Sequence, residues 1–227
     1  TAWPMAGLAP NARSRRIEES ATLAITAKAA KLKAAGADVV SLGAGEPDFV
    51  TPAPIAEAGI RAIEQGNTRY TAAPGTPELR AAGAKWLNAT FGLGFGADEV
   101  MVCAGAKGAL HMALDAVVEP GQKVLILAPY WVSYPALVTM ADGVPVIVPA
   151  AIERGFVHDA ATIDAAIRQH RAAGLIVNYP NNPSGAVPTR AQVQALVDVA
   201  KANDVWLLSD EIYATLLYDG AEHIPLM

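Results

Sequence analysis

From residue 99 onward, short apolar runs alternate with segments of helical periodicity, and this alternation constrains the fold more than any other feature of the chain. The runs are nearly continuous in Val, Ile and Leu, which predicts strands buried on both faces. Strands that alternate with helices form a mainly parallel sheet. The sequence therefore predicts a three-layer α/β fold, with helices on both faces of the sheet. Strands are predicted at 99–103, 123–128, 144–149, 174–179 and 205–209, with helices at 107–118, 133–141, 161–172 and 189–202.

The first part of the chain is less regular. Residues 1–20 are polar and carry a cluster of arginines, so we interpret them as an arm. The run Gly43-Ala44-Gly45-Glu46-Pro47-Asp48 follows a short predicted strand at 39–42, and its Gly and Pro content predicts a shaped loop. Helices are predicted at 21–35, 54–64 and 77–90.

Charge and composition exclude several classes of function. The net charge of -5 and the pI near 5.3 argue against nucleic acid or an anionic membrane as partner. The single cysteine, Cys103, rules out an internal disulfide and suits a reducing compartment. No apolar run is long enough to span a membrane, and the first residues lack a secretory signal, so a cytoplasmic location is expected. The four histidines show no ligand spacing, so no metal site is indicated.

The unusual side chains of the chain follow the predicted strands. In an open α/β sheet, ligands bind beyond the carboxyl ends of the strands. Gly105-Ala106-Lys107 enter a helix after the first predicted strand, where backbone amides can approach a phosphate. Trp131 follows the second strand and offers a face for stacking on a flat ring. Asn182 lies between two prolines after the fourth strand, so its amide can be held toward a ligand.

Asp210 follows the apolar run Val205-Trp206-Leu207-Leu208 almost directly. A carboxylate beside a buried strand is costly unless a cation or hydrogen-bond donor meets it, and no basic residue is close in sequence. Its partner is therefore a distant side chain or a ligand, and a protonated pyridine nitrogen fits. Taken singly, Asn182 reads as a turn residue and Trp131 as core. Only the joint arrangement, completed by Tyr213, predicts a site for a phosphorylated aromatic cofactor.

These segments together resemble fold-type I pyridoxal-phosphate enzymes, specifically class I aminotransferases close to bacterial aspartate aminotransferases. The resemblance implies that residues 1–50 form an N-terminal arm and a segment of a small domain. Residues 51–227 would be the N-terminal part of the large cofactor-binding domain, incomplete at its C-terminus. The matching motifs are Ser20-Ala21-Thr22, Gly43-Ala44-Gly45-Glu46-Pro47-Asp48-Phe49, Thr68-Arg69-Tyr70, Pro129-Tyr130-Trp131-Val132-Ser133-Tyr134-Pro135, Asn181-Asn182-Pro183-Ser184-Gly185 and Ser209-Asp210-Glu211-Ile212-Tyr213.

The resemblance also assigns roles around pyridoxal 5'-phosphate. Asp210 would keep the pyridine nitrogen protonated, Tyr213 and Asn182 would hydrogen-bond the phenolic oxygen of the ring, and Trp131 would stack on the ring. Of these, Asp210, Tyr213 and Trp131 are the predicted catalytic residues. Gly105, Ala106 and Lys107 would bind the phosphate.

Substrate and subunit contacts are implied in the same way. Gly45, Trp131, Asn182 and Lys107 would contact the amino acid or 2-oxo acid, and a lysine at position 107 favours a dicarboxylic substrate. Tyr70 would reach the cofactor phosphate of the neighbouring subunit in a homodimer. Glu18-Glu19 replace the basic residue that relatives accepting prephenate tend to carry, which argues against prephenate.

The chain departs from the family at its end. The Schiff-base lysine and the carboxylate-binding arginine of the family are expected beyond Met227, because the seven lysines of this chain lie in other contexts. The 227-residue chain alone is therefore predicted to be an inactive part of an aminotransferase, with an exposed sheet edge. Two alternatives stay open: a pyridoxal-phosphate-dependent C–S lyase on the same scaffold, and a lysine-less relative that binds a ligand without turnover.

Overall fold

The structure is a computed structural model of the chain and describes residues 9–18, 20–43, 45 and 48–226. It divides into two compact units, one formed by Thr1–Ser20 with Ala104–Met227 and the other by Ala21–Cys103. Each unit is considered by itself. The predicted domain boundary between residues 50 and 51 stays a prediction.

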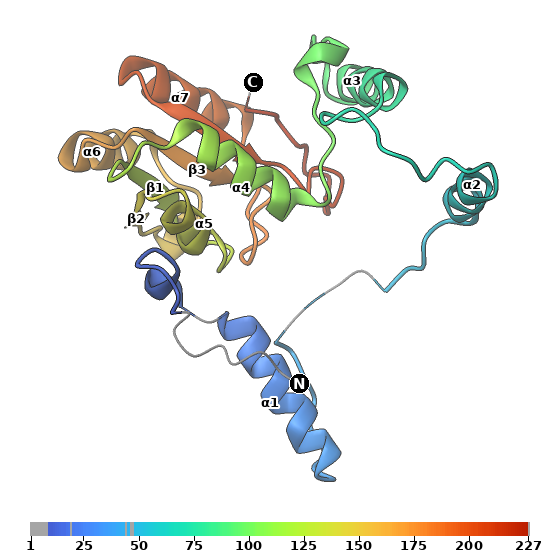
Figure 1. The fold of residues 1–227 in the computed structure, drawn as a ribbon. Coiled ribbons are helices and arrows are strands. Elements are labelled where there is room, and N and C mark those ends of the chain that lie inside the picture. The colour runs from blue at the N-terminus through green and yellow to red at the C-terminus, as the bar shows by residue number, and fades with distance from the viewer. Residues whose placement is uncertain (1–8, 19, 44, 46–47, 227) are drawn as a thin grey trace. The chain divides into compact units, whose positions relative to one another are not determined.

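The first unit is built on a four-stranded parallel sheet (Figure 1). Its strands lie in the order β2-β1-β3-β4, and this confirms the predicted mainly parallel sheet. Residues Asn178 and Asp210 end neighbouring strands and are partners in the register, so both reach the same carboxyl edge. The strands are β1 (Lys123–Leu127), β2 (Val144–Val148), β3 (Gly174–Asn178) and β4 (Trp206–Asp210).

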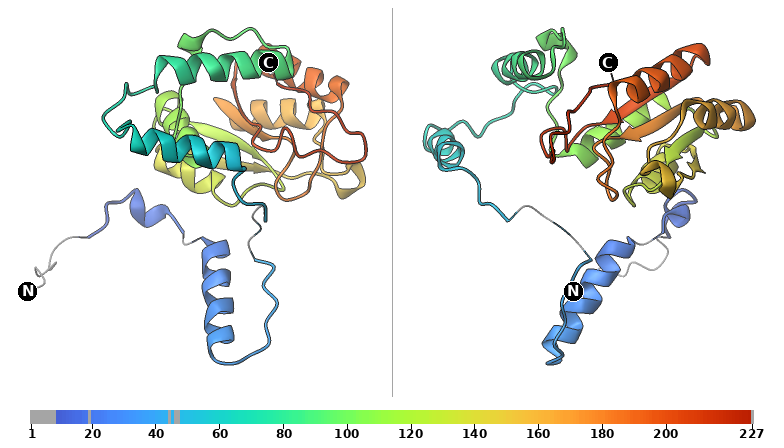
Figure 2. Two further views of the ribbon diagram at one scale, coloured as in Figure 1. Left: turned by 90° about the vertical axis from the view of Figure 1, so that its right-hand side faces the viewer. Right: turned by 180° about the vertical axis from the view of Figure 1, so that it is seen from behind.

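Helices cover both faces of this sheet, as the sequence predicts (Figures 1 and 2). Alternate residues of each strand point to opposite faces, so Leu125 packs toward one pair of helices and Ile126 toward the other. The helices on the Leu125 face are α6 (Ala160–His170) and α7 (Arg190–Ala202), and those on the Ile126 face are α4 (Ala106–Val117) and α5 (Tyr134–Met140). Every residue of β3 is buried, which marks it as the centre of the core.

Helix starts follow the local sequence in one case and not in another. The side chain of Thr189 caps α7 by accepting a hydrogen bond from the backbone N–H of Gln192. The backbone N–H of Thr189 in turn donates to the side-chain oxygen of Gln192. Ser133 directly precedes Tyr134 and Pro135, and its residue type at this position predicts a cap of α5. In the structure it has a helical backbone conformation, and its side chain makes no capping bond. A capping residue needs an extended backbone to aim its oxygen at the first turn, so the prediction for Ser133 is wrong.

Two predicted strands are absent from the described structure. Residues 100–103 and 39–42 are irregular, and the former follow a short 3-10 turn, η2 (Ala97–Glu99). The N–H of Val102 donates to the carbonyl of Pro74 at 3.0 Å instead of to a neighbouring strand. An apolar run becomes a strand only where a second strand satisfies its backbone groups, and residues 100–103 pair with none of β1 to β4.

The second unit is helical in its described part and buries little. It contains α1 (Ala21–Ala34), α2 (Ala53–Glu64) and α3 (Pro77–Phe91). Among its described side chains, only Ala84 is fully buried. Ile55, Ile60 and Ile63 of α2 are all exposed. This unit therefore lacks a core comparable to that of the sheet.

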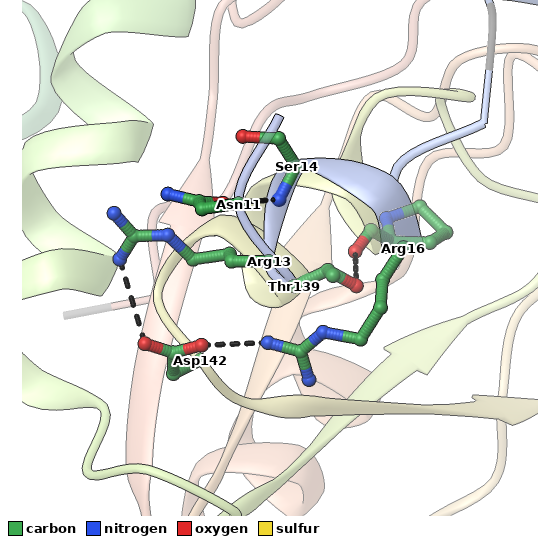
Figure 3. Close-up of polar contacts among 7 residues, drawn as sticks. Asn11, Arg13, Ser14, Arg16, Thr139 and Asp142 are labelled. Carbon is green, nitrogen blue, oxygen red and sulfur yellow. Dashed lines mark hydrogen bonds and ion pairs between the residues drawn. The ribbon is translucent and has the colours of Figure 1, made fainter. Parts of the chain in front are cut away.

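The N-terminal segment is tied to the turn after α5 (Figure 3). Arg13 precedes a 3-10 turn, η1 (Ser14–Arg16), and Arg16 ends it; each reaches a different oxygen of Asp142, at 3.5 and 2.6 Å. Asp142 has a left-handed backbone (φ 58), which allows the tight turn into β2. The predicted arm is thus anchored on the unit that contains the sheet. A further 3-10 turn, η3 (Ile152–Arg154), follows β2.

Candidate active site

A pocket of about 280 Å³ opens at the carboxyl ends of β3 and β4. It belongs wholly to the unit that contains the sheet. The structure brings together in its wall seven of the residues predicted from the sequence, namely Gly105, Ala106, Lys107, Trp131, Asn182, Asp210 and Tyr213. Tyr134, Asn178 and Ile212 complete the lining.

Asp210 is the buried carboxylate of this pocket. It is the last residue of β4, and only 8% of its surface is exposed. The hydroxyl of Tyr134 donates to its Oδ2 at 2.7 Å, and the backbone N–H of Ile212 donates to its Oδ1 at 3.2 Å. No ion pair of the described residues includes Asp210. Its partners within the chain are therefore neutral donors, and its remaining lone pairs are free to meet a cationic group of a ligand.

Tyr134 is the neighbour that sequence reasoning missed. Burial raises the pKa of its phenol well above the usual value, and the nearby charge of Asp210 and the hydrogen bond to it act in the same direction. Tyr134 is therefore a permanent donor at neutral pH. Its ring also meets Trp131 edge to face, with centroids 5.5 Å apart and an interplanar angle of 85°.

Asn178 links two of the strand ends that build the site. Its side-chain N–H donates to the backbone carbonyl of Asp210 at 2.9 Å, while its Oδ1 accepts from the backbone N–H of Asn182 at 2.8 Å. The Asn182 side chain in turn donates to the hydroxyl of Tyr213 at 3.4 Å. Asn182 and Tyr213, both predicted to hydrogen-bond the phenolic oxygen of the cofactor ring, thus lie side by side.

The loop after β3 is fixed by its own hydrogen bonds. Asn181 donates from Nδ2 to the carbonyl of Pro129 at 3.0 Å and accepts from the backbone and the hydroxyl of Ser184. The bond to Pro129 joins this loop to the loop after β1, which carries Trp131. These hydrogen bonds therefore hold the loops that carry Trp131 and Asn182 in place.

The part of the pocket wall formed by the start of α4 is suited to an anion. Gly105 precedes α4 with a left-handed backbone (φ 82) and has no side chain to cap the first amides of the helix. Those amides carry partial positive charge and are suited to an anion. The ammonium group of Lys107 lies 4.8 Å from the centroid of the Trp131 ring. The pocket therefore has an anionic end at Asp210 and an anion-binding end at α4.

Other predicted residues lie elsewhere. Gly45 and Tyr70 belong to the second unit, are exposed, and do not line this pocket. Ala44, Glu46 and Pro47 of the same predicted loop lie outside the described residues, as does Glu19. Where the structure describes the chain, no group of three His, Cys, Asp or Glu residues is arranged to hold a metal ion. None of the helices described here combines the length and apolar character needed to cross a membrane.

Three lining residues, Tyr134, Asn178 and Ile212, were not predicted as site residues. Asn178 is a polar residue at the end of a buried strand, and this position could have indicated that it belongs to the site. Tyr134 lies 76 positions before Asp210, so the sequence gives no sign of their contact. Ile212 contributes through its backbone N–H, which any residue supplies.

The fold and this pocket define the class of protein: an α/β protein with a pocket at the carboxyl ends of parallel strands, the place where such folds bind ligands. The chain belongs to the family of class I and II aminotransferases, whose pattern matches residues 37–226. Aminotransferases of this family are pyridoxal-phosphate-dependent.

Individual relatives are similar over nearly the whole chain. It is 45% identical over 221 residues to a probable aspartate/prephenate aminotransferase of Thermus aquaticus, covering 97% of this chain and 57% of the relative. It is 44% identical to the aspartate aminotransferase of Geobacillus stearothermophilus, covering 94% and 54%. The solved aspartate aminotransferase of Thermus thermophilus with maleate has a TM-score of 0.91 at 43% identity, covering 96% and 57%. The chain thus spans little more than half the length of these relatives.

Proposed function

We propose that the full-length protein containing this chain is a pyridoxal-phosphate-dependent aminotransferase. It exchanges an amino group between an L-amino acid, preferably aspartate-like, and a 2-oxo acid. The observation that carries this proposal is the buried Asp210, whose carboxylate lines a pocket and whose partners among the described residues are neutral donors. Such a carboxylate is stabilised by a protonated ring nitrogen.

The residues around the pocket fit the cofactor by their chemistry. When bound, the cofactor supplies an electron sink for the negative charge that develops at the substrate α-carbon. Asp210 holds a proton on the ring nitrogen, and Trp131 covers one face of the ring. Asn182 and Tyr213, which already contact each other, hydrogen-bond the phenolic oxygen.

The anionic groups of cofactor and substrate meet the part of the pocket wall formed by the start of α4. Gly105 and Ala106 bind the phosphate through the amides of the first turn of α4, and Lys107 adds a positive charge. Lys107 also favours a substrate with a second carboxylate, which agrees with relatives named as aspartate aminotransferases. Because Glu19 lies outside the described residues, the prediction against prephenate rests on the sequence alone.

The remaining predicted contacts form part of the same proposal. Gly45 contacts the substrate carboxylate, and Tyr70 reaches the cofactor phosphate of a second subunit in a homodimer. The fully exposed side chain of Tyr70 suits such a role. A cytoplasmic location stays a prediction from composition.

Lys107 is the one lysine among the pocket residues, and it is committed to the anion-binding wall. We therefore propose that a lysine outside these 227 residues forms the covalent bond to the cofactor. It follows that the 227-residue chain by itself is inactive.

The experiment compares the full-length protein with the 227-residue chain. With aspartate and 2-oxoglutarate, we expect turnover only in the full-length protein, and borohydride reduction should fix one pyridoxyl group to it, seen as an added mass. Product analysis with a cysteine-type substrate distinguishes a C–S lyase, which releases pyruvate and ammonia. Turnover by the 227-residue chain, or a full-length protein that neither takes up the cofactor nor transaminates, would overturn the proposal.

A matched pair of variants tests the observation itself. Asp210→Asn keeps the size of the side chain but loses the charge, so activity of the full-length enzyme should fall on the order of 10³-fold, because a buried charge would lose its partner. Asp164→Asn, on the exposed side of α6, is the control and should leave activity within about twofold. Equal activity of the two variants would remove Asp210 from the site.

A further inference from the structure

Tyr134 contacts two of the residues that are proposed to hold the cofactor ring. Its hydroxyl donates to Asp210 at 2.7 Å, and its ring meets Trp131 edge to face. It is the first residue of α5 and is 2% exposed, so the helix start and the core fix its position.

We propose that Tyr134 is a positioning residue whose hydroxyl orients the Asp210 carboxylate toward the ring nitrogen of the cofactor while its ring sets the plane of Trp131. This inference rests on the proposed function, because it assumes that pyridoxal phosphate occupies the pocket. It concerns only residues of this chain and predicts which atom of Tyr134 matters.

The hydrogen bonds of Asp210 show why the hydroxyl matters. Each carboxylate oxygen receives one donor, Oδ2 from Tyr134 and Oδ1 from the backbone of Ile212. Two donors on different oxygens prevent the carboxylate from rotating and leave a lone pair on each oxygen for the pocket. Removal of the Tyr134 hydroxyl would leave one side-chain oxygen without a donor and let the plane of the group turn.

The same bond would also affect how firmly a proton is held on a ring nitrogen. With the hydroxyl in place, a carboxylate oxygen can stay directed at that nitrogen. Without the hydroxyl, the carboxylate could turn away, the proton would be held less firmly, and the ring would be a weaker electron sink. Because Tyr134 remains protonated when buried beside Asp210, it donates throughout the physiological range.

Packing alone does not need the hydroxyl, and the chain offers a control for this. Tyr179 is also buried, at 4%, but lies in the core on the opposite face of the sheet and outside the pocket. Its hydroxyl makes only a 3.5 Å contact with His158. Tyr179→Phe therefore removes a buried hydroxyl from the same unit without touching Asp210 or Trp131.

The test uses the full-length holoenzyme with pyridoxal phosphate labelled with ¹⁵N in the ring. The chemical shift of the ring nitrogen reports its protonation directly and does not depend on turnover. In Tyr134→Phe we expect the shift to move toward that of the unprotonated ring, with kcat lower by about 10-fold or more, as for a lost hydrogen bond to a charged group. KM should change by less than about twofold, and Tyr179→Phe should match the wild type in shift and kcat.

A second variant gives the opposite sign and retains the fold. Incorporation of 3-fluorotyrosine at position 134 keeps the ring and the hydroxyl but makes the hydroxyl a stronger donor. The ring nitrogen should then hold its proton more firmly than in the wild type, with the shift displaced away from that of the unprotonated ring. This variant decides the matter if Tyr134→Phe fails to fold.

The outcomes separate the inference from the proposed function. If the wild-type enzyme binds the cofactor and transaminates, but Tyr134→Phe gives the shift and kcat of Tyr179→Phe, the inference is overturned and the proposed function stands. A 3-fluorotyrosine variant whose shift stays at the wild-type value or moves toward that of the unprotonated ring also overturns the inference. If wild-type full-length protein binds no pyridoxal phosphate, the proposed function fails and the inference falls with it.

Discussion

The sheet-containing residues 104–226 and the helical residues 21–103 have similar shares of apolar residues but very different interiors. In the first region, β1, β3 and the helices around them hide side chains such as Leu125 and Ile163 completely. In the second region, Ile60 of α2 is 56% exposed and Ala84 is the only described side chain that is fully buried. An apolar residue therefore contributes to stability only where a second layer covers it.

The same comparison explains why residues 100–103 do not form the strand that the sequence predicts. This run and β1 are both apolar, but β1 has a parallel strand on each side and residues 100–103 have none among the described strands. The backbone of residues 100–103 has partners outside a sheet, since the carbonyl of Val100 accepts from Arg80 and the N–H of Val102 donates to Pro74. The backbone groups of β1 are instead satisfied by β2 and β3. Pairing, and not composition, separates a strand from a loop here.

The largest expected difference between the regions is in their response to loss of an isoleucine side chain. Ile163→Ala removes a fully buried side chain and should cost about 2–5 kcal/mol of unfolding free energy. Ile60→Ala, the matched change in α2, should cost no more than about 0.5 kcal/mol. Urea unfolding of the 227-residue chain measures both. If Ile60→Ala lowered the unfolding free energy by more than about 1 kcal/mol, roughly twice the expected bound, α2 would be covered in solution. The contrast between the two regions would then be wrong.

Two glycines should respond to alanine with opposite signs. A Cβ at Gly174 in β3 would lie 2.0 Å from the Trp206 ring, so Gly174→Ala should destabilise by about 1–3 kcal/mol. A Cβ at Gly59 in α2 meets nothing within 4 Å, and alanine favours the helix, so Gly59→Ala should stabilise by up to about 1 kcal/mol. Thermal melting followed by circular dichroism checks both signs. Equal signs would contradict the packing described for Gly174.

Mild acid should weaken the sheet region, because His158 is buried there. Burial lowers the pKa of His158 below its ordinary value of 6.5, with Val148 and Asp159 partly opposing the shift. The unfolded chain thus binds the proton more readily, so the stabilisation by neutral His158 is complete above about pH 6.5 and is lost as the pH falls through the lower folded pKa.

The measurement is urea unfolding at about pH 7 and about pH 5 for the wild type and His158→Gln. Glutamine can still donate to the carbonyl of Val148, which His158 contacts through Nε2 at 3.0 Å, but cannot take up a proton. The wild type should lose more stability than the variant over this range. An identical loss would show that His158 titrates normally.

The smallest effect is expected at the anchor of the N-terminal segment. Asp142→Asn keeps a residue that tolerates the left-handed turn but removes the charge shared by Arg13 and Arg16. These side chains are about half exposed, so the loss should be about 0.2–1 kcal/mol and should shrink in high salt. Hydrogen exchange of residues 9–18 should increase in the variant at low salt. No change at low salt would mean that the ion pairs do not hold the segment.

Much of the fold and part of the site were predictable from sequence because the signals are local. The strands β1 to β4 and the helices between them follow from periodicity, and Thr189 marks the start of α7. Asp210 stands out because a carboxylate at the end of an apolar strand is costly wherever that strand pairs. The strands predicted at 39–42 and 99–103 were wrong, because a strand forms only beside a second strand. The periodicity of a segment does not report whether such a partner is present.

The sequence by itself determined the layered α/β architecture and the kinds of side chain that gather at the strand ends, since both depend on short-range patterns. Only the tertiary structure decided which of those side chains touch. The bond from Tyr134 to Asp210 and the bridge from Asn178 to Asn182 arise where the loop after β1 and the ends of β3 and β4 meet. Contacts between distant residues depend on strand order and register, and these are fixed only when the whole sheet packs.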